Sequence, residues 1–216
     1  MKSNLLRPFE TIPYFTIEGF RQSTGMDSPD QTRMLLHRWV KAGKVLSLKK
    51  GMYMTSRFYE LHVRDTLFTE AVSAIIFPQS YLSLEFVLQK HNILTEVTYP
   101  VTCITPKNTR KITNQIGAFW YRNIRSDLYH GFVAREYNGI RFFTACLAKA
   151  LFDYLYLRPI PAKYRGEKID LAEELRLNLD EIPKDERDEF SLYVEKSASR
   201  KMMEILNNFR RTIWKP

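Results

Sequence analysis

Side chains that could do acid–base or metal chemistry are present, but they do not form a catalytic pattern. The four histidines (His37, His62, His91 and His130) are scattered, and no His-x-x-x-His or Cys-x-x-Cys pair has zinc-ligand spacing. A nuclease would need carboxylates clustered around a metal. The best candidate set is Asp153 with Lys149, alongside Asp127 and Glu136. The four-residue spacing of Lys149 and Asp153 favours a helical ion pair instead, so we expect no enzyme, no metal and no cofactor.

Basic residues near the start of the chain have a more informative spacing. Arg33, His37, Lys41 and Lys44 recur at intervals that place them on one helix face. Such a helix fits the DNA major groove, and cations on a nearby hairpin can neutralise phosphates. The predicted DNA contacts are Ser28, Asp30, Gln31, Arg33, His37, Arg38, Lys41, Lys44, Lys49 and Lys50. A solvated helix surface is the alternative for the charged face alone, and protein binding is the alternative for the whole arrangement.

The elements that would position these cations are predicted between Thr16 and Thr55. A short helix starts at Thr16 and stops at Gly25, and Ser28-Pro29 then starts a second helix that ends at Gly43. Two β runs, 45–48 and 52–55, are joined by Lys49-Lys50-Gly51. This order predicts a winged helix-turn-helix. Its expected core is Phe20, Leu35, Leu36, Trp39, Val45, Leu46 and Tyr53, closed by an extra helix or arm within 1–15 that includes Ile12.

The remaining chain predicts a second domain, and the expected fold class is α+β. We expect domains at 1–65 and 66–216, linked by the charged segment 57–65, with Ser83 capping a helix over 84–91. The second domain should contain a mostly antiparallel sheet and C-terminal helices. The expected strands are 97–105, 110–113, 117–123, 131–137 and 140–143, with a turn at Asn138-Gly139, followed by helices over 145–157, 170–177 and, interrupted at 197–199, 185–214.

Net charge is +9 and is unevenly distributed. The excess of Lys and Arg lies in residues 1–158, whereas 159–216 is balanced, as expected if the first part faces a polyanion. Lys107, Arg110 and Lys111 are possible secondary DNA contacts, although a solvated loop is the simpler alternative. Cys103 and Cys146 lie among apolar residues and are expected to be buried free thiols. With no signal peptide and no membrane partner expected, we predict a cytoplasmic protein.

The order of motifs also resembles the AbiEi antitoxins of type IV (AbiE) toxin–antitoxin systems. The residues that carry the resemblance are Tyr81-Leu82-Ser83-Leu84, His91-Asn92-Ile93, Phe119-Trp120-Tyr121-Arg122 and the helix from Ala145 to Leu157. Within that helix Lys149, Ala150, Leu151, Asp153 and Tyr156 match the family pattern. Leu147-Ala148 replaces its Pro-Glu pair, and Asn92 stands where the family usually has Gly.

The resemblance implies a transcriptional autorepressor that binds inverted repeats in double-stranded DNA of its own promoter. It also implies an antitoxin that counteracts a nucleotidyltransferase-like toxin, without requiring direct contact between the two proteins. The alternative is a stand-alone winged-helix transcription factor with a sensing or protein-interaction domain. A nuclease is the third and weakest interpretation.

Overall fold

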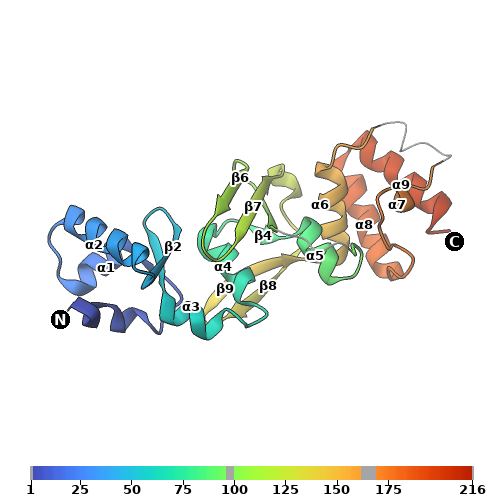
Figure 1. Ribbon diagram of the computed structural model, residues 1–216. Coiled ribbons are helices and arrows are strands. Elements are labelled where there is room, and N and C mark those ends of the chain that lie inside the picture. Colours follow the sequence, from blue (N-terminus) through green and yellow to red (C-terminus); the bar gives the residue numbers. More distant parts are fainter. Residues whose placement is uncertain (1, 96–99, 162–168, 216) are drawn as a thin grey trace. The chain divides into compact units, whose positions relative to one another are not determined.

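The computed structural model describes residues 2–95, 100–161 and 169–215 (Figure 1). In these ranges the chain forms nine α-helices and two β-sheets, which confirms the α+β class. Its contacts divide it into two compact units. Unit 1 is Met1–Pro78, Ile112–Ala118 and Glu136–Phe142, and unit 2 is Gln79–Lys111, Phe119–Arg135 and Phe143–Pro216. These units are defined by contacts rather than by independent folding, so the domain boundary at residue 65 stays a prediction.

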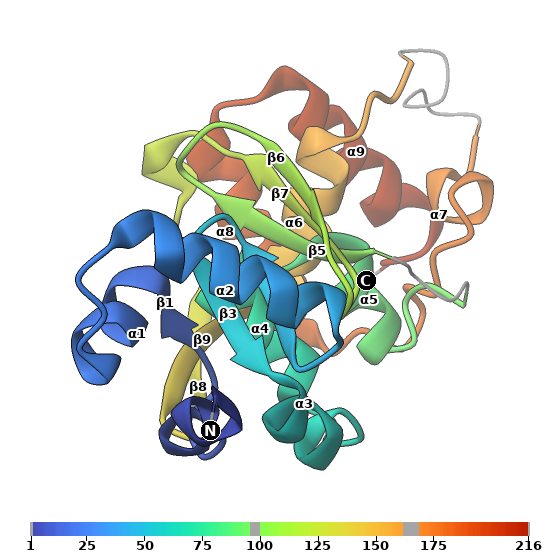
Figure 2. The same ribbon diagram turned by 60° about the vertical axis from the view of Figure 1, so that its left-hand side comes forward.

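Unit 1 begins with a small antiparallel sheet and helices packed against it. Its N-terminal elements are η1 (Lys2–Phe9), β1 (Phe15–Thr16), α1 (Ile17–Thr24), α2 (Pro29–Lys41), β2 (Val45–Lys49), β3 (Met52–Thr55), α3 (Ser56–His62) and α4 (Phe68–Ile76). The strand order is β1-β3-β2, with Phe15 opposite Tyr53 and Val45 opposite Thr55. Helix α2 packs on β2 (Figure 2).

The first helix starts and stops where its sequence predicts. The hydroxyl of Thr16 accepts a hydrogen bond from the amide of Gly19 at 3.0 Å, which satisfies one of the unpaired donors of the first turn. Gly25 ends α1 with φ at +66°, a left-handed conformation that a residue without a Cβ adopts readily. A short connection then leads into α2.

Aromatic rings form the core under α1 and α2. Phe20 is fully buried, with Trp39 edge-on at 5.6 Å and Phe9 of η1 at 5.2 Å between ring centroids. The predicted core residues are buried, except that Tyr53 is half-buried. The expected participation of Ile12 is wrong. This residue lies after the end of η1 and is 38% exposed.

The segment 57–65, predicted as a linker, is largely helical. Thr55 accepts a hydrogen bond from the amide of Phe58 at 3.2 Å and so caps α3, and Phe58 is buried. Beyond the helix the Tyr137 hydroxyl donates to the carboxylate of Asp65 and lies 2.8 Å from Nδ1 of His62. The charged sequence therefore includes a helix that buries one aromatic side chain, and its role as a link between domains stays a prediction.

A six-stranded sheet has the order β6-β7-β5-β4-β9-β8. Its strands are β4 (Tyr81–Leu82), β5 (Val101–Thr105), β6 (Arg110–Thr113), β7 (Ala118–Asn123), β8 (Phe132–Tyr137) and β9 (Ile140–Ala145). β4 pairs antiparallel with β5, whereas β5–β7 and β4–β9 are parallel. Asn138 and Gly139 have positive φ in the predicted β8–β9 turn. The expected strand start at 97–99 lies outside the described residues.

Four of the five described α-helices of unit 2 come from the C-terminal part of the chain (Figure 1, orange and red), and one comes from its middle (green). They are α5 (Leu84–Lys90), α6 (Leu147–Leu157), α7 (Leu171–Glu174), α8 (Lys184–Ser197) and α9 (Arg200–Thr212), with a short 3-10 turn, η2 (Ser126–Leu128). α6 packs on α5 and α8. The predicted interruption at 197–199 is confirmed, because Ala198 is left-handed and Ser199 caps α9. Among the described residues, no helix has the length and apolar character needed to span a bilayer.

Candidate nucleic-acid interface

Helix α2 is fixed at both ends by local hydrogen bonds. Ser28 accepts a hydrogen bond from the amide of Gln31 at 3.3 Å, and Pro29 occupies the first turn, where its missing N–H costs nothing. At the other end Gly43 has a left-handed backbone conformation, and the amide of Lys44 donates a hydrogen bond to the carbonyl oxygen of Trp39 at 2.9 Å. These caps define a helix whose opposite faces have different roles.

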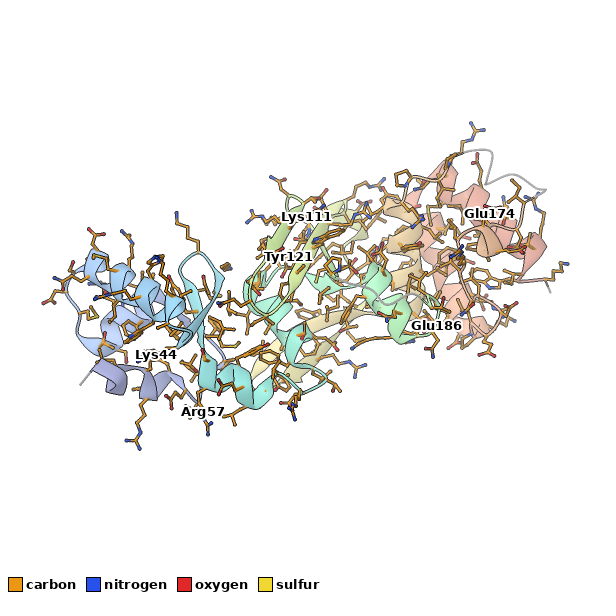
Figure 3. All side chains as sticks on the ribbon, viewed as in Figure 1. Lys44, Arg57, Lys111, Tyr121, Glu174 and Glu186 are labelled. Carbon is orange, nitrogen blue, oxygen red and sulfur yellow. The ribbon has the colours of Figure 1, made fainter. Side chains whose placement is uncertain are left out.

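One face of α2 is buried and the other is exposed. Thr32, Leu35, Leu36 and Trp39 are buried, as their spacing predicts. The outward residues are Asp30, Gln31, Arg33, Met34, His37, Arg38 and Lys41, and exposed Lys44 follows the helix (Figure 3). The cations of this surface outnumber its single carboxylate, so the exposed face of α2 is positively charged.

Two arginines on this face are already oriented by neighbours. Nη1 of Arg33 lies 2.9 Å from a carboxylate oxygen of Asp30, with the two side chains 67% and 83% exposed. Nε of Arg38 donates to the carbonyl oxygen of Met34 at 3.4 Å. An exposed ion pair of this kind contributes little to stability. The Arg33 guanidinium can therefore exchange Asp30 for a stronger acceptor at small cost.

The two lysines of the β2–β3 hairpin differ in their surroundings. Lys50 is exposed at the turn, next to Gly51 with φ at +77°. Lys49 is half-buried and its ammonium donates to the carbonyl oxygen of Ile76 at 2.6 Å. The prediction that both lysines form a basic tip therefore needs correction, because Lys49 is engaged within unit 1. The alternation of side chains along the strand predicts which residues face the core, but it does not predict this contact with α4.

The possible secondary contacts belong to unit 2. Lys107, Arg110 and Lys111 are exposed (Lys111, Figure 3), and Nζ of Lys111 lies 4.1 Å from the ring centroid of Trp120. Trp120 itself is 37% exposed. This is a cation–π contact on a strand pair and does not by itself indicate a nucleic-acid surface.

The candidate nuclease residues are not assembled into a site. Asp153 and Lys149 form the predicted ion pair at 2.6 Å, and both are fully buried. Asp127 is exposed and lies 2.5 Å from Arg125, and Glu136 is exposed on β8. Among the described residues, Cys146, Glu186 and Glu189 lie close enough together to hold a metal ion, and Asp153 does not belong to this group. The geometry therefore gives no support to metal-dependent cleavage at Asp153.

Asp153 instead joins two segments that are far apart in the sequence. One carboxylate oxygen accepts hydrogen bonds from the Tyr81 hydroxyl at 2.9 Å and the Ser83 hydroxyl at 2.8 Å, and the other accepts from Lys149. Burial raises the pKa of Asp153 and lowers the pKa of Lys149, while their mutual attraction opposes both shifts. We call Asp153, Lys149, Tyr81 and Ser83 the Asp153 cluster.

The Asp153 cluster corrects the expected role of Ser83. Ser83 precedes α5, but its side chain makes no capping hydrogen bond, and its hydroxyl donates to Asp153. A serine before a helix normally signals an N-cap, whereas a partner 70 residues later in the chain gives no local signal.

Cys146, Glu186 and Glu189 were not predicted to form a group. Cys146 caps α6, Glu186 accepts from the amide of Ala148 at 2.7 Å, and Glu189 accepts from the Tyr193 hydroxyl at 2.5 Å. Burial raises the pKa of the Cys146 thiol to about 11, so it is neutral near pH 7. The contact of Glu186 anchors the start of α6 to α8 (Glu186, Figure 3). Both cysteines are free, but only Cys103 is fully buried.

No protein-family model matches this chain, and no curated protein is significantly similar to it.

Proposed function

We propose that this protein binds double-stranded DNA through a winged helix-turn-helix in unit 1. The observation that carries the proposal is the capped helix α2, which buries one face and presents a cationic face to solvent. A helix of this kind fits the major groove and can meet base edges there.

The elements around α2 support the same proposal. α1 and α2 are joined by a short turn, the β2–β3 hairpin follows, and β1 pairs with β3 to give the sheet order β1-β3-β2. This succession of helix, turn, helix and hairpin is the one expected of a winged helix. With α2 in the groove, Arg33 would contact bases, while Lys41, Lys44 and Lys50 would contact phosphates.

We propose that the protein acts as an autorepressor, which binds the promoter of its own gene. Full-length protein is titrated into the DNA directly upstream of that gene and into scrambled DNA, at two salt concentrations. We expect preference for the upstream DNA. In Lys41→Gln/Lys44→Gln, the slope of log affinity against log salt should become less negative by about 1.8, because two phosphate contacts are lost.

A matched variant makes this measurement specific. Lys184→Gln/Lys215→Gln removes two exposed positive charges from unit 2 and should leave the slope unchanged. If the salt slope changed by the same amount in both double variants, only the net charge of the protein would matter. An absence of binding to either DNA would favour a protein-interaction role for α2.

We further propose that the protein is an antitoxin acting against a nucleotidyltransferase-like toxin. The specific observation is the Asp153 cluster, because it links Tyr81 and Ser83 to Lys149 and Asp153, two separate parts of the AbiEi-like pattern. Co-expression with an adjacent toxin gene should restore growth. The Lys41→Gln/Lys44→Gln variant should still protect when both genes are driven from an unrelated promoter, and failure of the wild type to protect would favour the stand-alone transcription factor.

A further inference from the structure

An apolar side chain lies within the polar outer face of α2. Met34 is 63% exposed and is four residues from Asp30 and Arg38 and three from His37. Residues at these spacings are neighbours on a helix surface. The buried face of α2, formed by Leu35, Leu36 and Trp39 among others, lies on the opposite side, so Met34 gains little from the protein core.

Apolar surface continues from Met34 along the flank of the helix. A recess of about 310 Å³ is lined by Met34, Leu5, Met26 and Leu35, with Gln31 and Arg38 as its polar residues. The carbonyl oxygen of Met34 also accepts the hydrogen bond from Arg38. An apolar contact surface therefore lies between side chains that can form hydrogen bonds.

The DNA major groove offers one kind of apolar group at a base edge, the C5-methyl of thymine. The unbranched thioether of methionine adapts its shape to such a group. A base edge that carries only hydrogen-bond donors and acceptors would be desolvated by the Met34 side chain without gaining a strong hydrogen bond from it, which is unfavourable. The chemistry of Met34 thus discriminates among the edges that α2 could meet.

We propose that Met34 contacts the C5-methyl group of a thymine and so determines sequence preference at one position of each bound site. This inference rests on the proposed function, since it requires α2 to enter the major groove. Arg33 would then recognise a base through hydrogen bonds, and Met34 would recognise a base through its methyl group.

The test removes the methyl group without changing any hydrogen bond of the DNA. Full-length protein is first used to select its binding sites from random-sequence duplexes. Each thymine of the selected site is then replaced in turn by deoxyuridine. For each α2 helix in the major groove, replacement of one particular thymine should weaken binding about fourfold. This is the effect of removing one buried methyl-sized group.

Variants then assign that effect to Met34. Met34→Ala should bind the thymine and deoxyuridine duplexes equally, whereas Met34→Leu should keep the discrimination. Leu192→Ala truncates another side chain that is 63% exposed, on α8, and should bind like the wild type. Unfolding midpoints of all variants should stay near that of the wild type.

Two results would overturn the inference in different ways. A wild type that selects a DNA sequence but shows the same thymine-to-deoxyuridine ratio as Met34→Ala at every position would exclude the methyl contact and leave the DNA-binding proposal standing. A wild type that selects no DNA sequence would overturn both, and Met34 would then be tested as a contact for a protein partner.

Discussion

Replacing Asp153 by Asn should be strongly destabilising. Asp153 is fully buried and accepts three hydrogen bonds, including that from the buried ammonium of Lys149. The amide is nearly isosteric but uncharged, so Asp153→Asn leaves Lys149 as a buried positive charge without its counterion. Breaking a buried pair in this way typically costs about 3–5 kcal/mol.

The Lys149→Met variant should behave differently and should reveal the pH dependence. It leaves Asp153 with the Tyr81 and Ser83 hydroxyls as donors, but without the cation that lowers the carboxyl pKa. Burial then raises that pKa further above the unfolded value. A raised acid pKa means that the native state retains a proton that the unfolded chain releases, so stability should increase as pH falls from 7 towards 5.

Urea denaturation of the full chain, followed by circular dichroism at several pH values, measures both effects. The double variant Lys149→Met/Asp153→Asn removes both charges and should be more stable than Asp153→Asn alone. Together with the wild type and the two single variants, it gives the coupling energy of the pair. Asp153→Asn destabilised by less than about 1 kcal/mol, or Lys149→Met destabilised further by acid, would refute an ion pair that is formed and buried.

Three further predictions, made with five substitutions, test separate features of the chain. Gly131→Ala should lower the unfolding free energy by at least about 2 kcal/mol, since a Cβ there would lie 2.4 Å from the Tyr193 hydroxyl oxygen and φ is +79°. Gly139→Ala is its control, with φ at +74° but no described atom within 4 Å of the Cβ, and should lose only about 1 kcal/mol. Lys49→Ala should reduce thermal stability by about 1 kcal/mol through loss of its bond to Ile76, whereas Lys50→Ala should weaken DNA binding without altering stability. Arg33→Ala should reduce discrimination between operator and random DNA by about 1–3 kcal/mol in a competition assay, and equal loss on both DNAs would exclude a base contact.

Elements with local signals were predicted well from the sequence. Thr16, Ser28 and Gly25 act within three or four residues of their own positions, and the structure confirms the helix ends that they predicted. The alternation of buried and exposed residues on α2 likewise follows from helical spacing alone. The turn at Asn138-Gly139 was predictable because both residues tolerate positive φ.

The contacts that could not be predicted join residues distant in the sequence. Lys149 and Asp153 were correctly paired by their spacing, but their burial depends on Tyr81 and Ser83, which come about 70 residues earlier. Lys49 was assigned to the hairpin tip because its partner, the carbonyl of Ile76, carries no side-chain signal. Local patterns specify which face of an element is polar, whereas the packed fold decides which polar group meets which.

The division of the chain into interleaved units has a consequence for biosynthesis. The chain passes from one unit to the other five times, so unit 1 receives its last segment, Glu136–Phe142, long after Pro78. At about 5–20 residues per second, the 64 residues between Pro78 and Phe142 take roughly 3–13 s to synthesise. During that interval His62, Asp65 and Phe68 have no Tyr137 to contact. A gene truncated between codons 79 and 135 would therefore encode a unit 1 without the segment Glu136–Phe142 and without the Tyr137 contacts to His62, Asp65 and Phe68.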